Sequence, residues 1–382
     1  MLIGIDASRT TAARRTGTEN YALSVTRELL ALGHDLADHR FRLYFNDPPP
    51  PDLLQGQAER RVIPFPRLWT HVRLSWEMAT RPPDLLFIPA HVLPLIHPPK
   101  SVVTVHDLGY LYHPDAHTPF QNAYLRWSTR YNARTAVRVL ADSQATRDDL
   151  VRHYEIPAGK IVVVYPGRDE TLRPVVDPVA LSAVRARYGL AGSYLLHVGT
   201  LQPRKNLIRL LRAFASLLAS GAEPAAPLPE GLQLVITGKR GWMVDDLLAE
   251  IQKLGLAAQG RVVLTGYVPD ADLPALLTGA LAFCFPSLYE GFGFPVIEAM
   301  ACGTPVVCSN VSSLPEVAGD AALLVDPLDV AALTAALARV ATDPGLRREL
   351  TERGFRQASR FSWRQSAHQV LKVLEEVGRE VD

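Results

Sequence analysis

Cysteine is scarce in this sequence, and long apolar runs are missing. The 382 residues include 3 cysteines without a CxxC pair, which excludes a disulfide framework and favours a reducing compartment. The uncharged stretch 273–289 is interrupted by Pro274 and Pro286, so no segment is expected to cross a membrane. Asp6 comes too early for the apolar core of a signal peptide, and we therefore expect a cytoplasmic protein.

A large net charge and the common nucleotide-binding loops are missing as well. The 40 basic and 39 acidic side chains leave a net charge of +1. No overall field therefore attracts nucleic acid, and we expect no such partner. The sequence contains neither a GxGxxG nor a Walker A motif, which disfavours dinucleotide-binding and NTPase functions.

Strand-like and helix-like segments alternate along both halves of the chain, which predicts parallel sheets. The alternation stops over 166–178, where prolines and mixed charges predict a linker. We therefore expect an α/β protein of two Rossmann-like, doubly wound domains, 1–170 and 171–361, with ligands in the cleft between them. The expected strands are 2–6, 40–45, 85–88, 102–105, 137–141 and 161–164, then 194–198, 234–237, 262–264, 281–285, 305–307 and 322–325.

One loop carries two cations at the expected start of a helix. The segment GTLQPRKN, 199–206, follows the expected strand 194–198, and Pro203 suits the first helical position. Arg204 and Lys205 would then lie in the first turn, where the helix dipole disfavours cations by about 0.3–1 kcal/mol. This placement indicates a phosphate site, and a solvated surface pair is the alternative.

Two glutamates stand alone in an otherwise uncharged stretch, 273–315. Glu290 precedes a glycine turn, and Glu298 lies in the helix expected after it. Ionised groups in apolar surroundings need partners, so the two acids indicate a ligand site. A capping carboxylate with a buried ion pair is the structural alternative, and a glycosidase acid–nucleophile pair is another enzyme class.

His106, after the expected strand 102–105, is a third candidate, although a histidine that closes a strand by a local hydrogen bond fits equally well. The histidines around it show no metal-ligand spacing, and the only DxD pair, Asp270 and Asp272, resembles a helix cap. We therefore expect no metal site. Gly17 lies in a loop after the first strand that is a weak phosphate-binding signal.

Together these segments resemble the retaining GT-B glycosyltransferases of family 4, above all the bacterial mannosyltransferases of surface-polysaccharide assembly. The likeness rests on GTLQPRKN at 199–206, EGFGFPVIEAMACGTPVV at 290–307 and SLPE at 313–316. It implies two Rossmann-like domains with the active site in the cleft. It also implies that the C-terminal helix, about 362–382, packs back on the first domain.

The resemblance implies a role for each matching residue. Glu298 would hold the ribose of a nucleotide-sugar, and Glu290 would contact hydroxyls of the donor sugar. Lys205 would bind the diphosphate, and Arg204 would be its second cation, because Thr200 stands where many relatives have arginine. The expected catalytic residues are His106, Arg204, Lys205 and Glu290. The expected donor-binding residues are Gly17, Gly199, Arg204, Lys205, Glu290, Gly291, Phe292, Gly293 and Glu298.

The same resemblance implies metal-independent transfer with retention, in which cations and a helix N-terminus stabilise the leaving diphosphate. No cofactor is expected beyond the nucleotide-sugar co-substrate, with GDP-mannose favoured and a UDP- or dTDP-sugar open. The acceptor would be a glycan or a lipid-linked molecule. The alternatives are a glycosidase that uses Glu290 and Glu298, and a non-catalytic sugar-nucleotide-binding protein.

Arginines and aromatic residues mix in two segments of the first half. The segment 60–81 interleaves arginines with Trp69 and Trp76, and no acid occurs between Asp115 and Asp142. A solvated helix face is one interpretation. The other is peripheral association with an anionic membrane, to which each basic residue would contribute about 1 kcal/mol.

Overall fold

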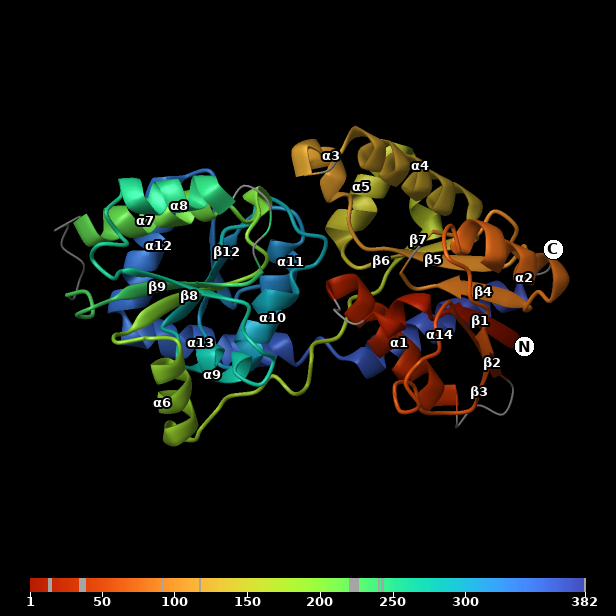
Figure 1. Ribbon diagram of the computed structural model, residues 1–382, viewed down its shortest axis with the longest axis horizontal. Coiled ribbons are helices and arrows are strands. Elements are labelled where there is room, and N and C mark those ends of the chain that lie inside the picture. The colour runs from red at the N-terminus through yellow and green to blue at the C-terminus, as the bar shows by residue number, and fades with distance from the viewer. Residues whose placement is uncertain are drawn as a thin grey trace. The chain divides into compact units, whose positions relative to one another are not determined.

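The computed structural model describes residues 1–12, 16–33, 39–90, 92–116, 118–219, 227–239, 241 and 244–380. Within them the chain forms two compact units, Met1–Gly167 with Phe361–Asp382, and Arg168–Arg360 (Figure 1). Each unit contains one parallel sheet covered by helices, which confirms the expected doubly wound α/β class. No helix of these residues is both long enough and apolar enough to span a bilayer.

The first unit has a seven-stranded sheet in the order β3-β2-β1-β4-β5-β6-β7. Its strands are β1 (Leu2–Asp6), β2 (Arg40–Phe45), β3 (Ala58–Val62), β4 (Leu85–Ile88), β5 (Ser101–Val105), β6 (Arg138–Ala141) and β7 (Ile161–Val163). The sequence did not predict β3, because this edge strand, AERRV, is charged and mostly exposed. It pairs in parallel with β2 all the same.

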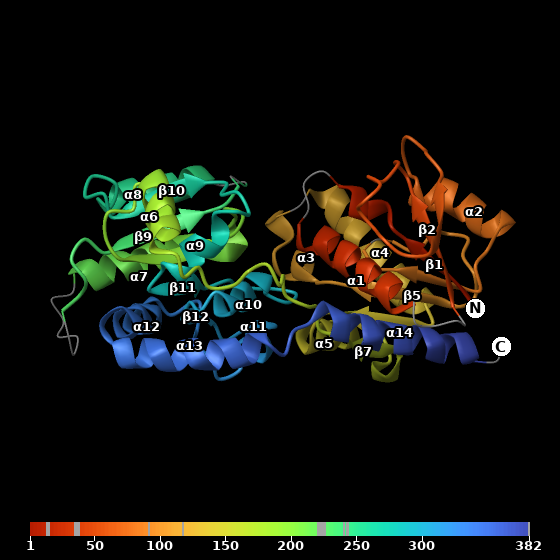
Figure 2. The same cartoon turned by 90° about the horizontal axis from the view of Figure 1, so that it is seen from below.

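Helices cover both faces of this first sheet. They are η1 (Ser8–Thr11), α1 (Gly17–Gly33), η2 (Thr70–Leu74), α2 (Ser75–Thr80), α3 (Gly109–Tyr112), η3 (Pro114–Ala116), α4 (Pro119–Thr135), α5 (Gln144–Tyr154), η4 (Ala158–Lys160) and α14 (Trp363–Arg379). On one face, α1 and the C-terminal helix α14 pack together over the strands (Figure 2). On the other face, α2, α4 and α5 form a second core.

The second unit has a six-stranded sheet in the order β10-β9-β8-β11-β12-β13. Its strands are β8 (Tyr194–Val198), β9 (Gln233–Thr237), β10 (Val262–Gly266), β11 (Ala282–Phe285), β12 (Val306–Ser309) and β13 (Ala322–Val325). Its helices are α6 (Pro178–Arg187), η5 (Pro203–Lys205), α7 (Leu207–Ala219), α8 (Val244–Lys253), α9 (Leu273–Thr278), α10 (Phe294–Ala301), α11 (Leu314–Ala318), α12 (Val330–Thr342) and α13 (Pro344–Ala358).

Each sheet has one point at which the strand order reverses. The reversal lies between β1 and β4 in the first unit, and between β8 and β11 in the second. The loops that leave two such neighbouring strands diverge to opposite faces and leave a crevice at the carboxyl edge. The loops after β8 and β11 contain the cation pair and the glycine turn found in the sequence, so they meet at this crevice.

Candidate active site

The loop after β8 holds its two cations outside the following α-helix. We expected Arg204 and Lys205 in the first turn of that helix, and this was wrong. They lie in the separate 3-10 turn η5, and Asn206 then adopts a left-handed conformation, φ 60°, before α7 begins at Leu207. Asparagine tolerates this conformation better than most residues, so the turn and the helix remain distinct.

Asn206 also fixes this loop to the rest of the sheet edge. Its amide nitrogen donates to Pro286 O at 3.0 Å and to Pro327 O at 2.7 Å. These carbonyls follow β11 and β13, so one side chain connects the carboxyl ends of three strands. No role was predicted for Asn206, because nothing in the spacing of the motif indicates which distant carbonyls its side chain would reach.

A buried ion pair joins the loops after β8 and β11. Lys205 Nζ lies 2.5 Å from Glu290 Oε1, and Arg204 Nη1 lies 3.0 Å from Glu290 Oε2. Both Lys205 and Glu290 are only 7% exposed. Burial raises the pKa of Glu290, but the charges of Lys205 and Arg204 outweigh it and hold that pKa below its usual value. The expected phosphate-binding cations are therefore already paired with a carboxylate.

The glycine turn that carries Glu290 is held from the loop after β12. Glu290 N donates to Ser312 Oγ at 3.0 Å, and Ser313 Oγ lies 2.9 Å from Glu290 O and 2.7 Å from Phe292 O. Gly293 immediately precedes α10 and has φ 107°, and a Cβ there would lie 2.7 Å from Leu314 Cδ2. The turn thus requires glycine at this position, and the two serines keep it close to Lys205.

Glu298 lies in α10 and differs sharply from Glu290. Its side chain is half-buried, and within the described ranges its carboxylate has no hydrogen-bond partner. Burial, together with the charges of Asp169 and Asp270, raises the pKa of Glu298 to about 7. A carboxylate in these surroundings is suited to accept hydrogen bonds from a ligand's hydroxyl groups.

We expected the DxD pair to cap a helix, but the side chain of Asp272 does not do so. It occupies the position before α9, but its carboxylate accepts hydrogen bonds from Arg187 Nη1 and from Tyr188 Oη, each at 2.7 Å. The charged guanidinium of Arg187 is a stronger donor than the backbone N–H groups at the start of α9, so the carboxylate binds Arg187 instead.

His106 belongs to the first unit and is fully engaged. Its Nδ1 lies 2.6 Å from Asp142 Oδ2, and its Nε2 lies 2.9 Å from Pro89 O. Burial lowers the pKa of His106, but the charge of Asp142 outweighs it, so the pKa is raised. A carbonyl only accepts, so Nε2 carries a proton. A hydrogen bond from His106 to a sugar would have to replace the one to Pro89.

The structure brings together the predicted donor-binding residues of the second unit only. Gly199, Arg204, Lys205, the glycine turn and Glu298 all lie at or near the carboxyl edge of the second sheet. Gly17, the exposed first residue of α1, and His106 belong to the first unit. Their expected approach to the donor remains a prediction.

Two family models match most of the chain. Glycosyl transferases group 1 matches residues 190–357, and Glycosyltransferase Family 4 matches residues 15–172. The chain is 38% identical over 275 residues to the O-antigen chain mannosyltransferase B of Escherichia coli, covering 72% of this chain and 70% of that protein. The chain belongs to glycosyltransferase family 4. The resemblance stated from the sequence is thereby confirmed.

Two further likenesses concern a longer relative and a solved structure. The family 4 chain is 28% identical over 281 residues to the serotype-specific mannosyltransferase WbdA of Escherichia coli, covering 72% of this chain but only 33% of that protein. HepE from Anabaena, in complex with UDP-glucose, superposes with a TM-score of 0.73 at 19% identity, covering 98% of this chain and 99% of that one. This second likeness shows the GT-B fold.

A family 4 glycosyltransferase transfers a sugar from a nucleotide-sugar donor to a glycan acceptor, and this chain is such an enzyme. The two alternatives from the sequence, a glycosidase and a non-catalytic binding protein, are therefore wrong. Glu290 is held by two cations rather than left as a free acid or nucleophile, which agrees with that outcome.

The different surroundings of the two glutamates predict different effects of Glu298→Gln and Glu290→Gln. Glu298→Gln should weaken nucleoside diphosphate binding by about 10- to 100-fold, the range for hydrogen bonds to a charged group. Glu290→Gln should not weaken this binding, because it removes a negative charge beside Lys205 and Arg204. Calorimetric titration with the nucleoside diphosphate measures both affinities. The reverse pattern would refute the assignment of Glu298 to the nucleotide and of Glu290 to the sugar.

The raised pKa of Glu298 adds a pH dependence. Below about pH 7 the carboxyl is largely protonated, so its contribution to binding should fall as the pH is lowered from 8 to 6. The affinity ratio between the unaltered protein and Glu298→Gln isolates this effect from ionisation of the nucleotide. A ratio that stays constant over this pH range would contradict it.

Proposed function

We propose that this glycosyltransferase transfers mannose with retention from GDP-mannose, or less readily from another nucleotide-sugar, to a growing glycan or a lipid-linked acceptor. The observation that carries the proposal is the Arg204–Lys205–Glu290 cluster at the strand-order reversal of the second sheet. Mannose is favoured because the O-antigen chain enzyme and WbdA are named mannosyltransferases.

The proposed reaction exchanges one anion for another beside the two cations. When the donor binds, its diphosphate takes over Lys205 and Arg204, and Glu290 is released to accept hydrogen bonds from sugar hydroxyls. As the anomeric C–O bond breaks, negative charge grows on the diphosphate and is stabilised by the two preorganised cations. The acceptor oxygen bonds to the anomeric carbon on the face that the diphosphate leaves, and its proton passes to a diphosphate oxygen.

Turnover with a panel of donors tests this function. GDP-mannose, UDP-glucose and a dTDP-sugar are incubated with a mannose-terminated oligosaccharide, and release of each nucleoside diphosphate is measured with and without EDTA. We expect the highest release from GDP-mannose, unchanged by EDTA, because side chains supply the charge that a metal ion would supply. No preference for GDP-mannose would refute mannose transfer. Complete loss on chelation, restored by Mg²⁺ or Mn²⁺, would refute metal independence.

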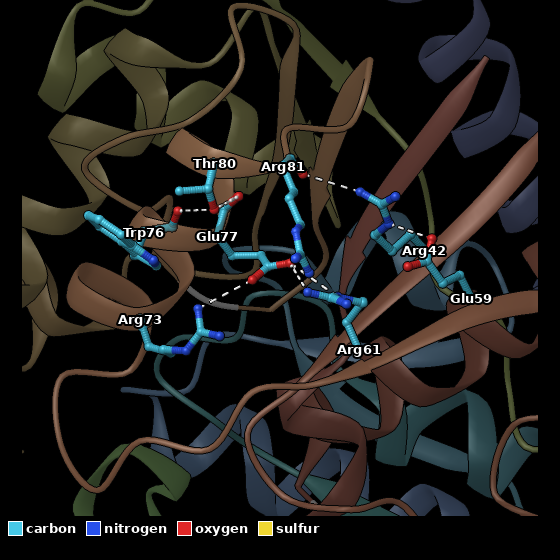
Figure 3. Close-up of polar contacts among 8 residues, drawn as sticks. All are labelled: Arg42, Glu59, Arg61, Arg73, Trp76, Glu77, Thr80 and Arg81. Carbon is cyan, nitrogen blue, oxygen red and sulfur yellow. Dashed lines mark hydrogen bonds and ion pairs between the residues drawn. The ribbon is translucent and has the colours of Figure 1, made fainter.

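The acceptor half of the proposal concerns a surface of the first unit. Not every arginine of the segment 60–81 is available to it. Arg61 Nη2 lies 2.7 Å and Arg73 Nη1 3.3 Å from the carboxylate of Glu77, which is 2% exposed (Figure 3). Trp69 is buried and donates to Ile63 O. Arg61, Arg73 and Trp69 are therefore engaged within the protein.

What remains exposed is an apolar surface with arginines beside it. Its side chains come from the region of η2 and α2 and from α4. The two parts are connected by His71 Nε2, which lies 3.0 Å from Tyr124 Oη of α4. The most exposed members are Leu68 at 68%, Trp76 at 64% and Phe120 at 81%. The remaining exposed members of this surface are Val72, Tyr124, Trp127, Arg126, Arg130 and Arg134.

This combination supports peripheral association with anionic lipid. Exposed tryptophan suits the membrane interface, and α4 carries three arginines and no acid. Within the described residues no carboxylate pairs with Arg126 or Arg130, so both charges are available to a phosphate headgroup. A lipid-linked acceptor in that membrane would then lie next to this surface of the first unit.

Replacing Arg126, Arg130 and Arg134 by serine should weaken binding to anionic vesicles without unfolding the protein, because exposed charges contribute little to stability. Binding of the unaltered protein should need anionic lipid and fall as salt is raised. Vesicle sedimentation at low salt measures both. The control replaces Arg339, Arg348 and Arg356, exposed on helices of the second unit. If the unaltered protein fails to sediment, the surface is merely solvated and the acceptor is a soluble molecule.

A further inference from the structure

His197, the fourth residue of β8, has a buried hydrogen-bond acceptor to which none of the described residues donates. The side chain is 0% exposed, and its Nδ1 lies 2.9 Å from Cys284 O. A carbonyl only accepts, so the proton is on Nδ1, and Nε2 presents a lone pair. Over the part of the chain that the structure describes, Nε2 has no hydrogen-bond partner. Buried polar groups in native proteins are nearly always paired, so this one points to an absent donor.

The ring is fixed in position and stays neutral. It stacks on Phe285, with centroids 5.7 Å apart, and on Phe283, with centroids 6.5 Å apart. Burial is the main cause that lowers the pKa of His197, to about 4, so the ring is uncharged at any pH near neutrality. The Nε2 lone pair is therefore a permanent feature of the site.

Nε2 faces the space beside Gly199 and Lys205. A Cβ placed on Gly199 would lie 3.3 Å from His197 Nε2 and 3.5 Å from Lys205 Cε. The imidazole and the end of the lysine chain therefore border the same small volume, which the missing side chain of glycine leaves open. Lys205 Nζ also lies 4.6 Å from the centre of the Phe285 ring, on which His197 stacks.

We propose that His197 is a positioning residue for Lys205, and that its Nε2 accepts a hydrogen bond from the lysine ammonium once the donor diphosphate has displaced Glu290. This inference rests on the proposed function, in which Lys205 binds the diphosphate. An ammonium group has three N–H donors, and in this proposal one of them is directed at Nε2 while the others are left for the diphosphate. A neutral acceptor holds the lysine in place without cancelling its charge, which Glu290 cannot do.

Two substitutions separate this role from packing. His197→Asn keeps a donor near the position of Nδ1, for Cys284 O, and loses the acceptor at Nε2. His197→Gln keeps a polar atom near Nε2. Whichever of GDP, UDP and dTDP binds most tightly is the probe. We expect His197→Asn to weaken its binding about tenfold and His197→Gln to restore most of that loss.

A double-mutant cycle with Lys205→Met decides whether the effect passes through the lysine. In the Lys205→Met protein, His197→Asn should cause no further loss of affinity. The control is Tyr194→Phe, on the same strand as His197. It removes the buried hydrogen bond from the Tyr194 hydroxyl to Leu276 O. It should lower the thermal midpoint but leave the diphosphate affinity unchanged.

An equal loss from His197→Asn with and without Lys205 would overturn the inference and show a packing role. Failure of His197→Gln to restore binding, while its thermal midpoint is normal, would overturn it too. If Lys205→Met alone leaves diphosphate binding unchanged, the role of Lys205 in the proposed function fails first, and this inference falls with it. These outcomes therefore distinguish failure of the inference from failure of the proposed function.

Discussion

The buried contact between Lys205 and Glu290 is the interaction on which the rest of this site depends. Removing two charges from water is costly, and such a pair is maintained only when the geometry is close and further hydrogen bonds support it. The supporting contacts are all present. Asn206 fixes the lysine loop to neighbouring strands, and Ser312 and Ser313 fix the glutamate turn. Both charges thus meet at 2.5 Å at the strand-order reversal of the second sheet.

This arrangement gives an economical account of sugar transfer. Without a donor, Glu290 is the counter-ion of buried Lys205 and of partly buried Arg204. In the proposed reaction, the donor diphosphate becomes the counter-ion, and the carboxylate is released for the sugar. The cations are already in place when charge develops on the leaving group, so little reorganisation is needed at that moment. We propose that His197 offers the lysine a second, uncharged acceptor during this exchange.

Much of this was predictable from the sequence, for physical reasons that also explain the failures. Buried parallel strands such as Leu85–Ile88 are continuous apolar runs, so their limits were found almost to the residue. The edge strand Ala58–Val62 is charged and gave no such signal. Glu290 stood out because it is a charge in an apolar stretch, but its partners come from a loop 85 residues earlier, which only the fold brings close. The roles of Asn206 and His197 likewise depend on distant carbonyls that no local pattern records.

The central claim is that Lys205 stabilises the leaving diphosphate, and the turnover number of Lys205→Ala at saturating donor tests it most directly. Exposed Lys253, at the end of α8, provides the matched control as Lys253→Ala. Loss of one preorganised electrostatic contact should lower kcat by at least about 100-fold. The control should leave kcat unchanged. A Lys205→Ala protein with the same thermal midpoint and the same kcat as the unaltered enzyme would contradict the account.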